Sequence, residues 1–268
     1  MAADLSTLDP QTTIATTPAD DSLGLDRAFA IQMARMPLLA ALWFLAAIVA
    51  HQVWAAVSPT GLNAGPLIVV CAGMILAAFI DGWALKVPNW VTLPLILSGW
   101  MLGLCHNLGI AVDAGTGGFG MAFLGTVLGF ALLLPMLVIR GVGEGDVKMQ
   151  MGFGAWVGAF FGTGATTEAA GLEFRLHGLG VVFWAFAFGA IIGGLFGMII
   201  ILMRRRFKEN RAILSGIASD LQLFAAGQTS AATRQAEERR KSWVKLPYGI
   251  PLCVGFLLYL GYVLILRT

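Results

Sequence analysis

Residues 65–89 read GPLIVVCAGMILAAFIDGWALKVPN, an apolar run that ends in an acid and is followed by a Pro-Asn pair. The first part of this stretch is long enough to cross the ~30 Å hydrocarbon core of a bilayer as a helix. Asp81 stands at the end of the apolar run, and Pro88 and Asn89 then break the backbone and start a second run, with Asn89 as the predicted helix cap. The stretch predicts two membrane helices joined by a short turn next to an acid.

The composition of the whole chain extends this interpretation. It is 58% hydrophobic and 12% charged, with a mean hydropathy of +0.81, whereas a soluble domain carries about a quarter charged residues. The sequence therefore predicts an all-α, polytopic membrane helix bundle of about seven transmembrane helices. The predicted spans are residues 37–57, 65–84, 91–110, 119–139, 147–162, 179–203 and 246–266.

The basic residues predict an orientation for these helices. If the N-terminus lies inside, all but two of the 17 Lys and Arg residues fall in inner segments, and only Arg175 and Arg267 fall in outer ones. Basic residues concentrate on the cytoplasmic side of membrane proteins. Lys86 and Lys148 therefore predict that the turn after residue 84 and the loop before residue 148 face the cytoplasm.

The sequence predicts four parts: an N-terminal tail, a six-helix membrane domain, a basic loop and a last transmembrane helix. Residues 1–36 are predicted to be a disordered cytoplasmic tail, since the first 26 lack the basic start and apolar core of a signal peptide. Residues 37–203 form the membrane domain with six helices and both acidic motifs, and residues 246–268 form the last transmembrane helix. Residues 204–245 form a basic cytoplasmic loop.

Two interpretations of the 204–245 loop stay open. It is either an amphipathic helix on the inner leaflet or a basic linker that anchors the topology. The first interpretation rests on an apolar stripe at helical spacing, formed by Ile213, Ile217, Leu221 and Phe224.

A second acid stands at another predicted membrane boundary. Residues 143–148 read GEGDVK and open directly into an apolar run. Gly143 and Gly145 permit positive φ and a close approach of the backbone to a ligand, so a substrate strand is predicted to lie against this turn. Asp146 alone would fit an ordinary helix N-cap. Together with Asp81, a second membrane acid reached from the same side, it indicates a functional site.

Two carboxylates that share one water are the equipment of an aspartic protease. Other chemistries find less support, because the three histidines have no metal-like spacing and the three cysteines stand singly. No nucleotide fingerprint stands out. The sequence therefore predicts no metal, no cofactor and no nucleic-acid partner. Glu144 is predicted to face solvent, and Arg140 and Lys148 to anchor the topology.

These residues resemble the type IV prepilin peptidases, which are intramembrane aspartic proteases with a GxGD motif. The resemblance rests on three segments in order, namely Asp81 with VPN at 87–89, GEGDVK at 143–148, and LPYGIP at 246–251, and it covers about residues 67–266. It implies that Asp81 and Asp146 are the catalytic pair. It also implies a set of residues that shape the loops and bind substrate: Gly143, Gly145, Pro88, Asn89, Pro247 and Tyr248.

The resemblance further implies a substrate and a location. Family members cut the short basic leader from prepilins and pseudopilins, usually after a glycine, at the cytoplasmic face of the bacterial inner membrane. Many also methylate the new N-terminus and carry a cysteine-containing insertion, which is absent between the first two spans here. The chain thus resembles the short, peptidase-only form associated with tight-adherence (Flp) pili. We expect prepilin substrates and membrane lipid as partners, and no methyl transfer. The resemblance does not specify the oligomeric state.

Two other functions stay in view. A small transporter or proton channel would place polar residues through the depth of the membrane, whereas the two acids here cluster at one face. A catalytically silent subunit of a pilus or secretion assembly would keep the fold and need neither acid.

Overall fold

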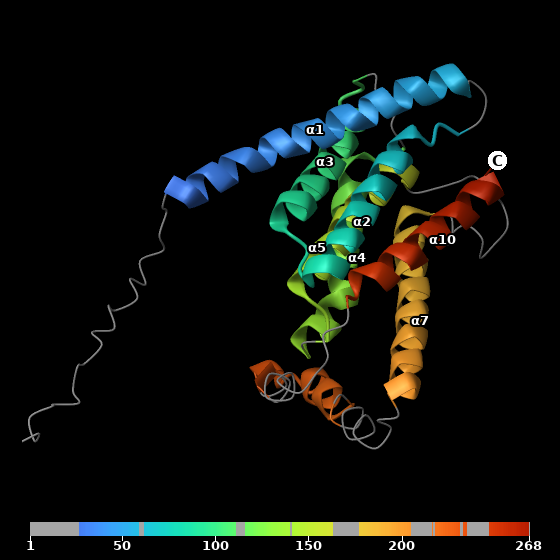
Figure 1. The fold of residues 1–268 in the computed structure, drawn as a ribbon. Helices are drawn as coiled ribbons and strands as arrows, with labels where there is room; N and C mark the ends of the chain where they lie inside the picture. Colours follow the sequence, from blue (N-terminus) through green and yellow to red (C-terminus); the bar gives the residue numbers. More distant parts are fainter. Residues whose placement is uncertain are drawn as a thin grey trace, which may run out of the picture. The chain divides into compact units, whose positions relative to one another are not determined.

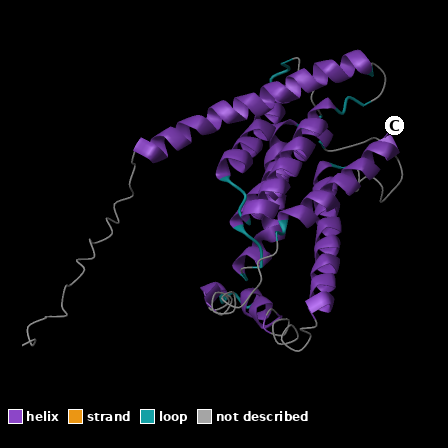
Figure 2. Cartoon of the chain, viewed as in Figure 1, coloured by secondary structure: helices purple, strands orange, loops and turns teal. Residues whose placement is uncertain are grey.

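The structure is a computed structural model, and it describes residues 27–58, 62–110, 116–139, 141–162, 177–204, 216, 218–230, 233–234 and 247–267. Within these residues every regular element is a helix, and none is a strand (Figure 2). The predicted all-α membrane bundle is confirmed.

Seven long helices follow one another along the described chain, one in each predicted span (Figure 1). Five are long and apolar enough to cross a membrane, namely α1, α2, α4, α7 and α10. For α3 and α5 the predicted crossing stays a prediction. The bounds are α1 Arg27–Val57, α2 Gly65–Ala84, α3 Asn89–Asn107, α4 Gly118–Val138, α5 Glu144–Phe161, α7 Gly178–Arg204 and α10 Gly249–Arg267.

Helix α5 is the central element of the bundle, which explains why it is less apolar than its neighbours. It packs against α2, α3, α4, α7 and α10, and most of its residues are buried. Its backbone approaches α4 closely, because Gly154 lies directly against Gly125 and Gly158 against the Met121 carbonyl. A helix enclosed by protein needs no lipid-facing side chains, so it tolerates the charged residues of its first turn.

Several predicted boundaries were wrong. Helix α1 begins at Arg27, so residues 27–36 are helical rather than a tail, and it continues through Pro37. The segment before Pro37 is rich in helix-forming Ala, Met, Gln and Arg, so the helix begins well before the apolar run. Helix α5 begins earlier than predicted, at Glu144, and α10 begins later, at Gly249. Residues 1–26 lie outside the described part of the chain.

The chain divides into two units, residues 1–35 and residues 36–268. The described residues of the first unit, 27–35, are helical. All the packing described below belongs to the second unit.

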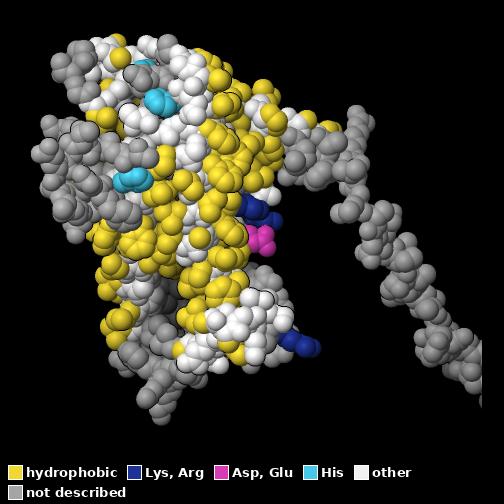
Figure 3. Space-filling view, turned by 180° about the vertical axis from the view of Figure 1, so that it is seen from behind, with side chains coloured by type: hydrophobic (Ala, Val, Ile, Leu, Met, Phe, Trp, Pro, Cys, Tyr) yellow, Lys and Arg dark blue, Asp and Glu magenta, His cyan; other side chains and the backbone are white. Residues whose placement is uncertain are grey.

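The second unit buries many large apolar side chains and leaves many others exposed. Its largest fully buried side chains include Trp156, Phe153 and Phe256. Hydrophobic side chains cover most of the described surface on the face seen in Figure 3, where charged ones are few. Exposed apolar residues recur along the span helices, such as Leu42 on α1 and Ile191 on α7. A multi-pass membrane protein presents this kind of surface to lipid.

The predicted loop at 204–245 is described in part. Residues 218–225 are helical, Leu221 is exposed and Asp220 is buried. Ile213 and Ile217 of the apolar stripe lie outside the described residues, so both interpretations of this loop stay predictions.

Candidate active site

Asp81 lies in the last turn of α2, with its side chain 5% exposed. The helix ends three residues later because Leu85 adopts a left-handed conformation, φ 52°, and its N–H donates to the Asp81 carbonyl at 2.8 Å. This cap turns the chain toward α3 at once. The carboxylate therefore stays inside the bundle while the backbone leaves it.

Asp146 is the third residue of α5 and is also 5% exposed. The N–H of Gly143, which precedes the helix in extended conformation, donates to Oδ2 of Asp146 at 3.1 Å. The other oxygen, Oδ1, is buried and has no hydrogen-bond partner within the described residues. Asp146 thus has one carboxylate oxygen held by a hydrogen bond and one without a partner. The N-cap of α5 is Gly143, so Asp146 is not the N-cap that an ordinary turn between helices would place there.

The glycines of the GEGD loop do not adopt the positive φ that the sequence suggested, and the approach of a substrate strand to this turn stays a prediction. Gly143 has φ −81°, and neither it nor Gly145 is among the described residues with positive φ. Gly145 does permit a close approach, but the segment that approaches it is the turn between α2 and α3. A β-carbon added to Gly145 would lie 2.8 Å from the Val87 Cβ. Val87 is buried at this contact. Gly145 therefore joins the two acidic segments, and this side of it faces protein rather than a substrate strand.

Gly249, the first residue of α10, lies between the two acids. Its N–H donates to Oδ2 of Asp81 at 2.9 Å. A β-carbon on Gly249 would lie 2.9 Å from the same oxygen and 3.3 Å from Oδ1 of Asp146. Both carboxylates therefore line the space beside one α-carbon. The positive end of the α10 helix dipole also favours negative charge there.

Sequence reasoning quoted the LPYGIP segment but left Gly249 out of the predicted site. The signal was present, because a glycine between Pro247 and Pro251 at a helix start offers a bare backbone donor. What the sequence lacked was the pairing of α10 with the end of α2. That pairing is a tertiary contact with no local pattern.

Tyr248 borders the site from the other side. Burial and the neighbouring Asp146 carboxylate raise the pKa of Tyr248. Its ring packs over Gly193 of α7, where an added β-carbon would lie 3.3 Å from Cε2 and Cζ. The predicted site residue Tyr248 is thus close to Asp146, and α7 provides the platform that holds its ring.

Pro88 and Asn89 support the site from α3. Pro88 is the extended residue before α3, and its carbonyl accepts the N–H groups of Val91 and Thr92. Asn89 does not cap the helix as predicted. Its Oδ1 accepts a hydrogen bond from Nζ of Lys148 at 2.9 Å, which ties the first turns of α3 and α5 together.

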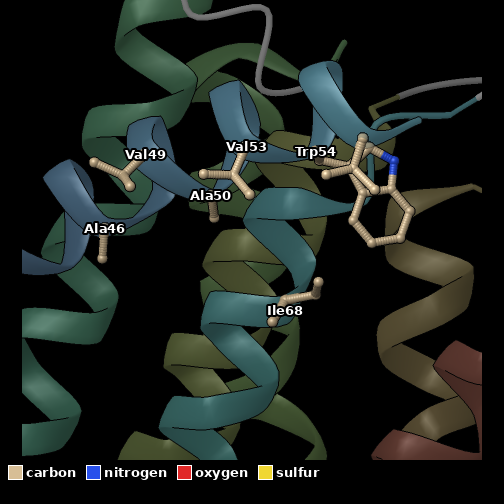
Figure 4. Close-up of a pocket in the computed structure, with 7 residues that line it drawn as sticks. Ala46, Val49, Ala50, Val53, Trp54 and Ile68 are labelled. Atoms are coloured by element: carbon tan, nitrogen blue, oxygen red, sulfur yellow. The ribbon is translucent and has the colours of Figure 1, made fainter. Parts of the chain in front are cut away.

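The two acids, Gly249 and Tyr248 therefore meet at one end of the bundle, where α2 ends and α5 and α10 begin. The described residues hold no cluster of His, Cys, Asp or Glu that could bind a metal ion. A separate open groove between α1 and α2 is lined by apolar side chains such as Val53, Trp54 and Ile68 (Figure 4). It holds no titratable group, so this groove is not suited to acid–base chemistry, whereas the carboxylate pair is.

Comparison with known proteins identifies related sequences. Residues 68–195 match the model of the type IV leader peptidase family, a range that includes both acids and ends before α10. A prepilin leader peptidase/N-methyltransferase of Neisseria gonorrhoeae is 35% identical over 98 residues, which are 34% of this chain and 32% of that protein. The matching part thus spans about a third of the length of this curated relative. No solved structure matches the chain.

Proposed function

Since this chain belongs to the type IV leader peptidase family, we propose that it is an intramembrane aspartic endopeptidase that removes the leader of type IV prepilins or pseudopilins. Asp81 and Asp146 activate the water that cuts the peptide bond. The single observation that carries the proposal is the placement of both buried carboxylates against the α-carbon of Gly249.

The chemistry follows from two carboxylates in different settings. Close acids do not ionise together easily, so the pair carries one proton between them. The ionised acid takes a proton from water, whose oxygen bonds to the peptide carbonyl carbon, and the protonated acid donates to the carbonyl oxygen. The C–N bond then breaks as the amine leaves with a proton from the pair, while one hydroxyl of the tetrahedral intermediate returns its proton to the pair and becomes the carbonyl of the new carboxyl group.

We assign Asp146 as the base and Asp81 as the acid. Each accepts one backbone N–H, from Gly143 and Gly249 respectively, so hydrogen bonding does not distinguish them. The helix dipoles do, because Asp146 lies in the first turn of α5 and Asp81 in the last turn of α2. The unpaired Oδ1 of Asp146 is also a ready acceptor for a water proton.

The proposed substrate class is supported by the name of a relative, and the proposed membrane side by the basic residues near the acids. The relative from Neisseria gonorrhoeae is named a prepilin leader peptidase, which supports a prepilin leader as substrate. Lys86 and Lys148 flank the acids, and basic residues favour the cytoplasmic side, here of the bacterial inner membrane. The scissile bond must be extended to expose its carbonyl, and the leader joins the site near Tyr248. We propose the peptidase activity alone, without methyl transfer.

The polar groups of the bundle disfavour a transporter. Ser98 and Thr126, deeper in the bundle, are bonded within it: the Ser98 hydroxyl donates to the Leu95 carbonyl and that of Thr126 to the Ala122 carbonyl. Each hydroxyl oxygen also accepts a hydrogen bond from a tryptophan indole N–H, Ser98 from Trp156 and Thr126 from Trp100. Such groups fasten helices together and form no ion path. A silent assembly subunit keeps the same fold, so activity has to separate it from the peptidase.

The test is a cleavage assay with the purified full chain in detergent. The substrates are several prepilin-type leaders with glycine before the cut, and mass spectrometry locates the products. We expect cleavage after that glycine and a loss of at least about 10²-fold in Asp81→Asn and in Asp146→Asn. Glu144→Gln is the control, because it removes an acid outside the pair and should still cleave. Equal cleavage by the Asp81→Asn or Asp146→Asn protein would contradict the proposal.

A further inference from the structure

A buried amide lies one helical turn beyond Asp146 on α5. Gln150 is 2% exposed, and its Nε2 has no hydrogen-bond partner within the described residues. An unpaired buried donor destabilises the folded protein, so such a group in a packed bundle needs a reason. An apolar side chain of similar size would fill this position without that cost.

Gln150 shares a helix face with Asp146. Residues four apart lie about 40° from each other around a helix, with β-carbons about 5–6 Å apart. Long side chains on a helix lean toward its N-terminus, which here carries Asp146. Further along the same face, Phe153 packs edge-on against Phe256 of α10, with ring centres 3.7 Å apart. From this helix geometry we infer that the amide points toward the carboxylate pair and the helix that begins with Gly249.

The two unpaired atoms are complementary to one kind of molecule. Nε2 of Gln150 can only donate, and Oδ1 of ionised Asp146 can only accept. A water between them would accept from Nε2 and donate to Oδ1, so it satisfies both. A peptide carbonyl would accept from Nε2 and leave Oδ1 unpaired. Water is therefore the better match for this pair of atoms.

We propose that Gln150 is a positioning residue that holds the attacking water on Oδ1 of Asp146. The inference rests on the proposed protease function, because the water it holds is the one that Asp146 activates. Gln150 exchanges no proton in the reaction. It orients the water oxygen toward the substrate carbonyl and keeps the water in place while Asp146 takes its proton.

The first test is Gln150→Met, which keeps the shape of the side chain and removes the donor. With the full chain and a cleaved leader, we expect kcat to fall about 10- to 100-fold at unchanged KM, because the water loses its position and the leader does not touch residue 150. The unfolding temperature should stay equal or rise, since a buried unpaired donor is gone. A structural residue would give the opposite pattern, with lower stability and unchanged kcat.

Gln150→Glu adds a readout that packing alone would not change. A protonated Glu donates a hydrogen bond as the amide does, whereas an ionised Glu does not. We expect this variant to keep more activity than Gln150→Met at acidic pH and to lose that advantage as the pH rises. A profile parallel to that of Gln150→Met at every pH would overturn the proposal.

Thr92→Val is the matched control. Thr92 is also fully buried, with an Oγ1 that has no partner within the described residues. It shares the α3 stripe of Leu95 and Gly99, which pack on Gly152 and Ala155, on the side of α5 away from Asp146. Its removal should leave kcat unchanged.

The outcomes separate the two proposals. If the wild-type chain cuts no prepilin-type leader, or if Asp81→Asn and Asp146→Asn cut as fast as it does, the protease function fails and the role of Gln150 fails with it. If those controls behave as expected but Gln150→Met keeps kcat within about twofold, only the positioning role is refuted.

Discussion

The backbone N–H of Gly249 donates a 2.9 Å hydrogen bond to Oδ2 of Asp81, although the two residues are 168 positions apart in the sequence. The bond joins the last turn of α2 to the first residue of α10. It fixes one carboxylate while leaving its other oxygen free for chemistry, and it uses a donor that no side-chain substitution removes. The close approach requires a residue without a β-carbon.

Gly249→Ala should therefore abolish most of the activity. The added methyl group would lie 2.9 Å from Oδ2 of Asp81 and 3.3 Å from Oδ1 of Asp146, so at least one carboxylate has to move. A displacement of about 1 Å in an active site can cost about 10²-fold in rate, and we expect a loss of at least that size in leader cleavage. Gly261→Ala is the control on the same helix, because a β-carbon there meets nothing within 4 Å. Equal activities of the two variants would contradict the role given to Gly249.

Gly145→Ala should destabilise the protein, although alanine is the better helix former. Its β-carbon would lie 2.8 Å from the Val87 side chain and 3.0 Å from the Val87 carbonyl oxygen. Overpacking of this kind costs about 1–3 kcal/mol, which exceeds the gain of up to ~1 kcal/mol expected from helix propensity. Gly120→Ala, in the first turn of α4 with no neighbour within 4 Å, should be neutral or stabilising. Thermal unfolding in detergent measures both, and the same sign for both would refute the argument.

The sequence predicted what local patterns encode. The apolar runs gave a helix in every predicted span, and the acids at their ends marked Asp81 and Asp146, which lie together in the structure. The positive φ suggested for the GEGD glycines is not found, and the reason is physical. A glycine can serve a positive φ or a close contact, and the sequence does not say which: at Gly145 it is the contact with Val87.

Two other features needed the three-dimensional arrangement. Gly249 became part of the site only when α10 packed against the end of α2. Asn89 suggested a helix cap, but its side chain instead accepts from Lys148 on another helix. Pro88 stands at the N-cap position instead, and the partner of Asn89 is 59 positions away, which no local pattern encodes.

The Asn89–Lys148 hydrogen bond should contribute modestly to stability. It is solvent-exposed, and exposed interactions of a charged group contribute about 1 kcal/mol or less. Asn89→Ala and Lys148→Met should each lower the free energy of unfolding slightly, and the double variant should lose less than the two together by about 0.5 kcal/mol. A double-mutant cycle from thermal unfolding gives the coupling. Strict additivity would show that the contact joins α3 to α5 without stabilising them.

Tyr248 should make stability depend on alkaline pH. Burial, and after it the Asp146 carboxylate, raise its pKa above the ordinary value of 10.0, so the folded protein holds the phenol proton more tightly than the unfolded chain. That contribution is complete below pH 10.0 and is lost as the pH rises through the higher folded pKa. Wild-type protein should therefore lose stability more steeply above about pH 10 than Tyr248→Phe, which keeps the ring over Gly193.

Asp146→Asn provides the second arm of this test. Removing the carboxylate charge removes one of the two causes of the raised Tyr248 pKa and leaves the burial in place. The alkaline loss of stability should still begin near pH 10.0, which the unfolded chain sets, but it should be complete at a lower pH than in wild type and be smaller in extent, yet persist. Unfolding temperatures measured across the alkaline range give all three curves. If wild type and Asp146→Asn coincide, the tyrosine hydroxyl does not sense the carboxylate, and its place in the substrate site loses its electrostatic support.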